Sequence, residues 1–263
     1  MKLIDRAKQV LWKKSGLDHD NQGYLKKPEL NLLPDIDAKI IEGDYRKGSG
    51  HEWNSKFRAI HSSAALVANT FGKWKTEPAQ LRFAGYAGFD KLVFEAKCPT
   101  GLGGTAPHLD VLLQSDDTVI GIESKFLEPL ELTAPIFSDS YSKNRLPLCE
   151  DAWWTLLENV RQWPKSHLDA SQLIKHYLGL RNNFPNCKNV MLVYLFWKPL
   201  NADKFEEYGS HAKELEKFQH TIRNSNMVQF KAMDYLQLWN DWEKDKNMTE
   251  HTKRLKDRYC VEI

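Results

Sequence analysis

The spacing of the apolar residues changes from a helical period to a period of two between residues 71 and 92. In the first stretch the apolar residues recur every three or four positions, at Trp53, Phe57, Ile60, Ala64, Val67 and Phe71. This spacing predicts one helix over about 51–71 that ends at Gly72. Such a helix would carry Glu52, Lys56 and Ser63 together on a neighbouring face, because positions eleven apart are nearly in line after three turns.

Downstream of residue 92 the pattern is typical of strands joined by short turns. Strands are expected at 92–97, 109–114 and 119–126, with the turn SDDT between the last two. A buried strand is expected at 189–197 and a short one at 227–232, and helices near 2–14, 150–163, 169–180 and 203–224, with one or two more at the end. Helix, β-meander, helix, strand, helix predicts a mixed α/β fold.

The chain length bounds the domain organisation. A chain of 263 residues buries one sizeable core rather than several. Residues 15–34 are rich in glycine, proline and other turn residues, so residues 1–48 are expected to form an N-terminal extension packed on a main domain at 49–263. The segment 43–50 is expected to be a hinge or loop between them.

Charge and cysteine content exclude several classes of protein. The formal net charge of +2 is too small to indicate a nucleic-acid partner, although it allows a local basic cleft. The four cysteines form no CxxC pair, which argues against a zinc finger or a disulfide framework. No stretch is apolar and long enough for a signal peptide or a membrane span, so we expect a soluble cytoplasmic protein that does not enter a membrane.

The most informative residues lie on the two central strands of the meander. Side chains alternate along a strand, so Glu123 and Lys125 share one face, while Ile120, Ile122 and Phe126 point into a core on the other. If the SDDT turn pairs the strands, Asp110 comes close to Glu123. Two neighbouring carboxylates repel each other unless a cation compensates, and Mg²⁺ prefers such oxygen ligands. Asp110 and Glu123 are therefore candidate Mg²⁺ ligands, and Lys125 is a candidate catalytic lysine.

The segment from Pro107 to Asp110, followed after twelve residues by Glu123-Ser-Lys125, resembles the signature of the PD-(D/E)xK nuclease superfamily. The run at 61–72 is similar to a stretch in an uncharacterised bacterial branch of restriction-endonuclease-like proteins. The resemblance implies a restriction-endonuclease-like core in which helices flank a mixed sheet. It also implies metal binding by Asp110, Glu123 and the Ser124 carbonyl, with Mn²⁺ able to replace Mg²⁺, and products with a 5′-phosphate and a 3′-hydroxyl.

In this superfamily the helix before the hairpin often supplies a further acid, and Glu52 is the candidate for that role. Its position in a first helical turn is equally compatible with a structural role, and Glu42 and Glu77 are weaker substitutes. On the later helix, Gln172 and Lys175 are candidates for contact with the metal or a phosphate. His108 is expected to be a hydrogen-bonded hairpin residue rather than a ligand.

The resulting interpretation is a Mg²⁺-dependent nuclease that acts on nucleic acid, with DNA favoured over RNA, in restriction, defence or repair. One alternative is a catalytically inactive nucleic-acid-binding or scaffold domain of the same fold. Another is an unrelated α/β enzyme that uses two carboxylates without metal, for example on sugars. The sequence does not predict the sequence specificity. It also does not predict the oligomeric state, for which a homodimer is one option.

Overall fold

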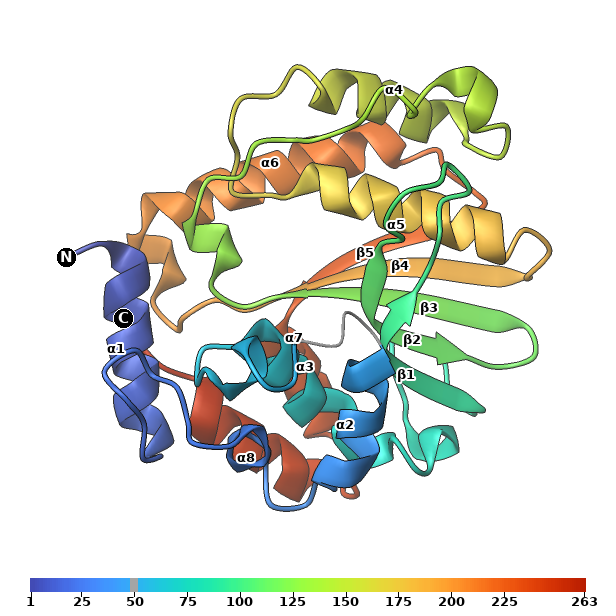
Figure 1. Cartoon of the computed structure of the whole chain (residues 1–263). Helices are drawn as coiled ribbons and strands as arrows, with labels where there is room; N and C mark the ends of the chain where they lie inside the picture. The colour runs from blue at the N-terminus through green and yellow to red at the C-terminus, as the bar shows by residue number, and fades with distance from the viewer. Residues whose placement is uncertain (48–51) are drawn as a thin grey trace.

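A computed structural model describes residues 1–47 and 52–263. Its centre is a mixed five-stranded sheet in the order β1-β2-β3-β4-β5, with helices on both faces (Figure 1). The strands are β1 (Lys91–Lys97), β2 (His108–Gln114), β3 (Thr118–Lys125), β4 (Asn189–Phe196) and β5 (Gln229–Asp234). The predicted α/β fold class, a mixed sheet flanked by helices, is confirmed.

The sheet changes from antiparallel to parallel at β3. β1, β2 and β3 form the expected antiparallel meander, whereas β4 and β5 run parallel to β3. Each parallel connection needs a crossover, and helices supply it. The first crossover contains α4 (Asp151–Val160) and α5 (Ala170–Asn183), and the second contains α6 (Glu206–Ile222). These three helices cover one face of the sheet (Figure 1).

Side-chain alternation along the buried strands divides the interior into two cores. In β4, Val190, Leu192 and Tyr194 pack toward α4, α5 and α6. Met191 and Val193 alternate with them and pack on the opposite side. That side is covered by α1 (Leu3–Ser15), α2 (Ala38–Lys47), α3 (Ser63–Phe71), α7 (Tyr235–Trp242) and α8 (Thr249–Tyr259) (Figure 1).

The N-terminal part of the chain contributes to this second core. Ala7 and Leu11 of α1 and Ile41 and Tyr45 of α2 are buried in the same cluster as Phe71 of α3. The predicted loop at 43–50 is wrong over 43–47, which belong to α2, and residues 48–50 lie outside the described residues. The predicted boundary between the extension and the main domain, at residues 48 and 49, also lies outside the described residues.

The prediction of one continuous helix over 51–71 is also wrong. Residues 52–55 form turns, a short 3-10 helix follows at Lys56–Arg58, and α3 begins only at Ser63. An N-terminal segment interrupts the helix: the Leu25 N–H donates to the Arg58 carbonyl (2.9 Å) and the Ile60 N–H to the Gly23 carbonyl (2.9 Å). The Ser62 hydroxyl then caps α3 by accepting from the Ala65 N–H (3.2 Å).

The end of α3 differs slightly from the expectation. The helix stops before Gly72 as predicted, but Gly72 stays right-handed (φ −61°) and starts a 3-10 turn that runs to Trp74.

None of the helices in the described part of the chain combines the length and the apolar character that a membrane span requires.

Candidate active site

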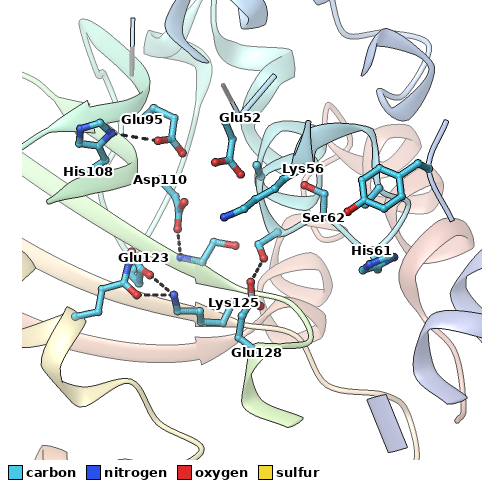
Figure 2. A pocket seen from close by; sticks show the side chains of 16 residues that line it. Glu52, Lys56, His61, Ser62, Glu95, His108, Asp110, Glu123, Lys125 and Glu128 are labelled. Carbon is cyan, nitrogen blue, oxygen red and sulfur yellow. Dashed lines mark hydrogen bonds and ion pairs between the residues drawn. The ribbon is translucent and has the colours of Figure 1, made fainter. Parts of the chain in front are cut away.

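A cavity of about 570 Å³ opens where the meander meets the N-terminal part of the molecule (Figure 2). One wall comes from β1, β2, β3 and the start of α5, and the other from residues 24 and 52–64. Its acidic and basic lining residues are Glu52, Lys56, His61, Glu95, His108, Asp110, Glu123, Lys125 and Glu128. Three of the predicted site residues, Asp110, Glu123 and Lys125, therefore meet in one cavity, and Glu52 and Gln172 join them there.

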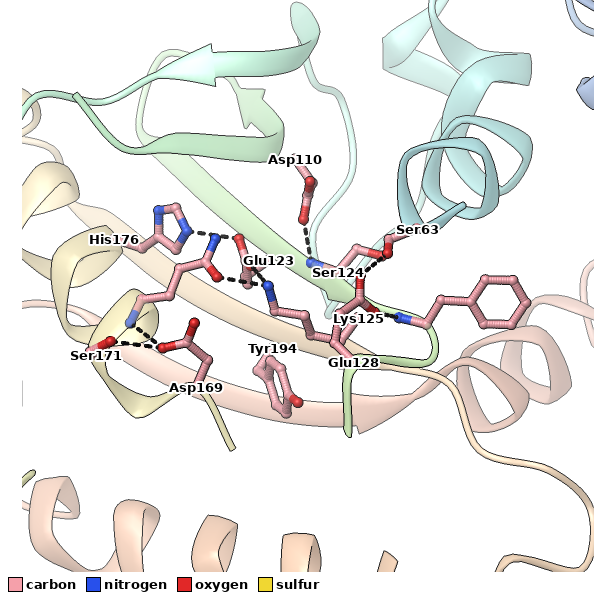
Figure 3. A network of polar contacts seen from close by, with 12 residues as sticks. Ser63, Asp110, Glu123, Ser124, Lys125, Glu128, Asp169, Ser171, His176 and Tyr194 are labelled. Atoms are coloured by element: carbon pink, nitrogen blue, oxygen red, sulfur yellow. Dashed lines mark hydrogen bonds and ion pairs between the residues drawn. The ribbon is translucent and has the colours of Figure 1, made fainter. Parts of the chain in front are cut away.

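The pairing of β2 with β3 brings Asp110 to Glu123. The last paired positions of this antiparallel ladder are Val111 and Ile122, and Asp110 and Glu123 are the next residues along the two strands. The Asp110 carboxylate accepts a hydrogen bond from the Ser124 N–H (2.6 Å), which holds it over the end of β3 (Figure 3). The Ser124 hydroxyl contacts the Tyr235 hydroxyl (2.6 Å).

Glu123 and Lys125 form a buried ion pair. The Lys125 Nζ lies 2.6 Å from Glu123 Oε1, and the side chains are 14% and 2% exposed. Burial alone would raise the pKa of Glu123, but the charges of Lys125 and then His176 lower it to about 2. Burial would lower the pKa of Lys125, and Glu123 more than offsets it, so that pKa is raised. The pair is thus charged at neutral pH.

Helix α5 contacts both members of this pair. Gln172 Oε1 accepts a hydrogen bond from Lys125 Nζ (2.7 Å). One turn later, the fully buried His176 places Nε2 2.7 Å from Glu123 Oε2, a close contact without the angles of a hydrogen bond (Figure 3). Lys175 does not line the cavity: its Nζ lies 5.6 Å from the centre of the Phe137 ring. Successive helical residues are rotated by about 100°, so Lys175 and His176 point in different directions.

Glu95 is a cavity residue that the sequence interpretation missed. It sits in β1 with a left-handed backbone (φ 51°), and the ladder with β2 skips it between Phe94 and Ala96. Phe94 and Ala96 consequently pack in different cores, although regular alternation would put them on one face. Burial, then Glu52 and Glu123, raise the pKa of Glu95 to about 7. An acid inside an apolar strand, the signal that singled out Asp110, also marks Glu95.

The opposite wall supplies Glu52, Lys56 and Ser63, the three residues that the sequence placed on one helix face. They come from a turn, a 3-10 helix and the first residue of α3 instead, yet all three line the cavity. Figure 2 shows the carboxyl group of Glu52 and the Lys56 ammonium turned toward the space in front of Glu95. Ser63 donates a hydrogen bond to Glu128. The substitutes Glu42 and Glu77 do not line the cavity.

His108 lies at the start of β2, where its Nδ1 is 3.4 Å from Glu95 Oε2. Burial, followed by the charges of Lys97 and His176, lowers the pKa of His108. This placement agrees with the expected role of a hydrogen-bonded residue of the hairpin.

The cavity contains more carboxylates than cations, and this favours a bound metal ion. Burial, then Glu123 and Glu95, raise the pKa of Asp110 well above its usual range. In the described part of the chain, no three His, Cys, Asp or Glu side chains already surround one point as a metal cage does. Mg²⁺ needs only one or two carboxylates, because water and substrate phosphate complete its coordination. The oxygen donors and surplus negative charge of Asp110 and Glu123 therefore fit such an ion.

Comparison with known protein families gives one match, over residues 6–260, to a family described as restriction endonuclease associating with ARP. Comparison with curated proteins and with solved structures gives no match. The matched region includes all five strands and every residue that lines the cavity. The chain therefore belongs to the family of restriction endonucleases associating with ARP.

Proposed function

We propose that this chain is a metal-dependent nuclease of the PD-(D/E)xK type that hydrolyses phosphodiester bonds, with DNA as substrate. One observation carries the proposal: Asp110, Glu123 and Lys125 converge from adjacent strands into a cavity that has a surplus of carboxylates. Family membership supports the nuclease class. Restriction, defence and repair are the contexts in which such an activity is used.

Asp110 and Glu123, with the Ser124 carbonyl, would hold Mg²⁺, and Mn²⁺ would substitute for it. A divalent ion at this place supplies Lewis-acid polarisation of the phosphodiester and a bound water of lowered pKa. The protein's own contribution is to keep the two carboxylates together, through the Ser124 N–H on Asp110 and the Lys125 and His176 contacts on Glu123.

We assign to Lys125 the role of orienting the nucleophile, which is the attacking water. Its ammonium is charged and held by Glu123 (2.6 Å) and Gln172 (2.7 Å), so it is oriented before substrate arrives. From this position it orients the attacking water and stabilises the negative charge that develops on the phosphoryl oxygens. Glu52 is the additional acid on the facing wall. Glu95 joins it on the β1 side, where its raised pKa suits proton transfer near neutral pH.

Plasmid nicking tests this proposal. The purified protein is expected to convert supercoiled DNA to nicked or linear forms with Mg²⁺ and not with EDTA. Glu123→Gln should abolish nicking, whereas Glu131→Gln, a change of the same chemistry at an exposed position, should leave it unchanged. Nicking in EDTA, or full activity of the Glu123 variant, would contradict the proposal. Wild-type protein that binds DNA but never cleaves it would favour the inactive-domain alternative.

A further inference from the structure

A second cavity, of about 610 Å³, is lined by residues that are neighbours in sequence of residues lining the first one. It is formed by residues 26–29, the start of α2 and residues 53–58. Its charged lining residues are Lys26, Lys27, Glu29, Lys39, Glu42 and Arg58. Four basic side chains and two acidic ones thus line this cavity. The basic residues come from three separate segments of the chain.

Most of this positive charge is available to a ligand. Within residues 1–47 and 52–263, the ammonium groups of the exposed Lys27 and Lys39 have no ion-pair partner. Lys26 pairs loosely with Asp18 (3.3 Å), and both side chains are more than 80% exposed. The acid Glu42 is already neutralised by Arg46 (2.5 Å), which strengthens the positive character of the cavity.

Arg58 is the one arginine that lines this cavity among the described residues. Its Nε is buried and has no hydrogen-bond partner among the described residues. Its guanidinium carbon lies 6.0 Å from the centre of the ring of Tyr24, which itself lines the first cavity. Arg58 also lines the second cavity, so its guanidinium places a permanent positive charge there.

The two cavities share the same two chain segments. Glu52 and Lys56 line the first cavity, and Trp53, Asn54 and Arg58, their neighbours in sequence, line the second. Tyr24 and Lys26 are divided in the same way. Because residues adjacent in sequence line the two cavities, a nucleic acid bound at Lys125 in the first cavity can extend to the lysines of the second.

We infer that the second cavity binds the sugar-phosphate backbone of the nucleic acid whose phosphodiester lies in the first cavity. The inference rests on the proposed nuclease function and assigns to residues 26–58 a role in substrate binding outside the catalytic group. Lys27 and Lys39 contact phosphates, and Arg58 adds a further positive charge to the same cavity. Lysine and arginine are the residues that bind phosphates irrespective of sequence, so this surface adds affinity and not sequence specificity.

Fluorescence anisotropy with a labelled DNA duplex, in EDTA to prevent cleavage, tests the inference. The double variant Lys27→Glu/Lys39→Glu should bind at least about tenfold more weakly than wild type, and the slope of log affinity against log salt should become shallower by about two. The milder Lys27→Gln/Lys39→Gln should lie between them. The control Lys188→Glu/Lys213→Glu changes the net charge equally at two exposed lysines that line neither cavity, and should bind within about twofold of wild type.

The outcomes separate this inference from the proposed function. If wild type nicks plasmid with Mg²⁺ but the Lys27/Lys39 variant binds like the control, the nuclease function stands and the inference is overturned. If wild type binds neither duplex, single-stranded DNA nor RNA, both fall. Preference for one of these three nucleic acids identifies the substrate. Unchanged thermal unfolding of the variants shows that a loss of affinity does not come from unfolding.

Discussion

At the scale of single residues, Asp110 is a buried acid whose negative charge the fold opposes. Burial and the nearby Glu123 and Glu95 raise the pKa of Asp110, so its ionised form destabilises the metal-free protein at neutral pH. Asp110→Asn should therefore weaken Mg²⁺ binding strongly in calorimetry and, without metal, raise the free energy of unfolding by about 1–2 kcal/mol.

The matched control for this prediction is Asp116→Asn, in the exposed turn between β2 and β3. It should change neither Mg²⁺ affinity nor stability measurably. Calorimetric Mg²⁺ binding that is the same in the Asp110 variant and in wild type would remove Asp110 from the metal site.

A second residue, His211 of α6, lies outside the cavity and makes the stability of the fold depend on pH. It is buried and its Nε2 lies 2.8 Å from the Tyr194 hydroxyl. Burial, then the charge of His167, lowers its pKa from 6.5 to about 4. The unfolded chain takes up a proton below about pH 6.5 and the folded chain only near pH 4. Stability is therefore lost as the pH falls through this window.

Urea unfolding at pH 7.5 and pH 5 measures the effect. The stability loss between these values should be smaller in His211→Gln than in wild type by about 1–2 kcal/mol. The exposed His220 provides the control, since His220→Gln should retain the full loss. An equal loss in the His211 variant and in wild type would show that His211 protonates equally in both states.

At the scale of elements, α5 contacts Lys125, the lysine proposed to be catalytic, with one face only. Gln172 holds Lys125 (2.7 Å), whereas Lys175, three residues later, lies over Phe137. Gln172→Leu removes the acceptor and leaves Lys125 to shift, so the single-turnover cleavage rate should fall about tenfold. Lys175→Ala, on the same helix, should cleave near the wild-type rate. A larger rate loss in the Lys175 variant than in the Gln172 variant would reverse this assignment.

Elements held by local signals could be predicted, and those held by long-range contacts could not. The period of two and the turn residues predict the meander and its alternation, and with them the approach of Asp110, Glu123 and Lys125. The periodicity of 53–71 indicated one helix, but pairing with residues 23–25 is stronger and divides it. Glu95 has a left-handed backbone within β1, and no glycine marks this position in the sequence. The contact between His176 and Glu123 depends on how α5 packs over β3.

At the scale of the whole molecule, the nearly balanced net charge of +2 conceals an uneven distribution. Carboxylates concentrate in the first cavity and lysines in the second, where Lys27 and Lys39 have no ion-pair partner among the described residues. The segment 52–58 borders both cavities. Residues 24–47 complete both walls and also bury Ile41 and Tyr45 in the core. The N-terminal region is thus part of the architecture that surrounds the site, which its turn-rich sequence alone did not indicate.

Lys125 is proposed to act on the reacting phosphodiester and not only as a structural partner of Glu123. Single-turnover plasmid nicking by Lys125→Met at saturating Mg²⁺ tests it most directly, because methionine keeps the apolar stem and removes only the ammonium. We expect the rate to fall at least about a hundredfold, while DNA affinity stays near wild type; saturating Mg²⁺ keeps the metal site filled even though the loss of the Lys125–Glu123 ion pair changes its affinity. Nicking by Lys125→Met at near the wild-type rate would contradict it.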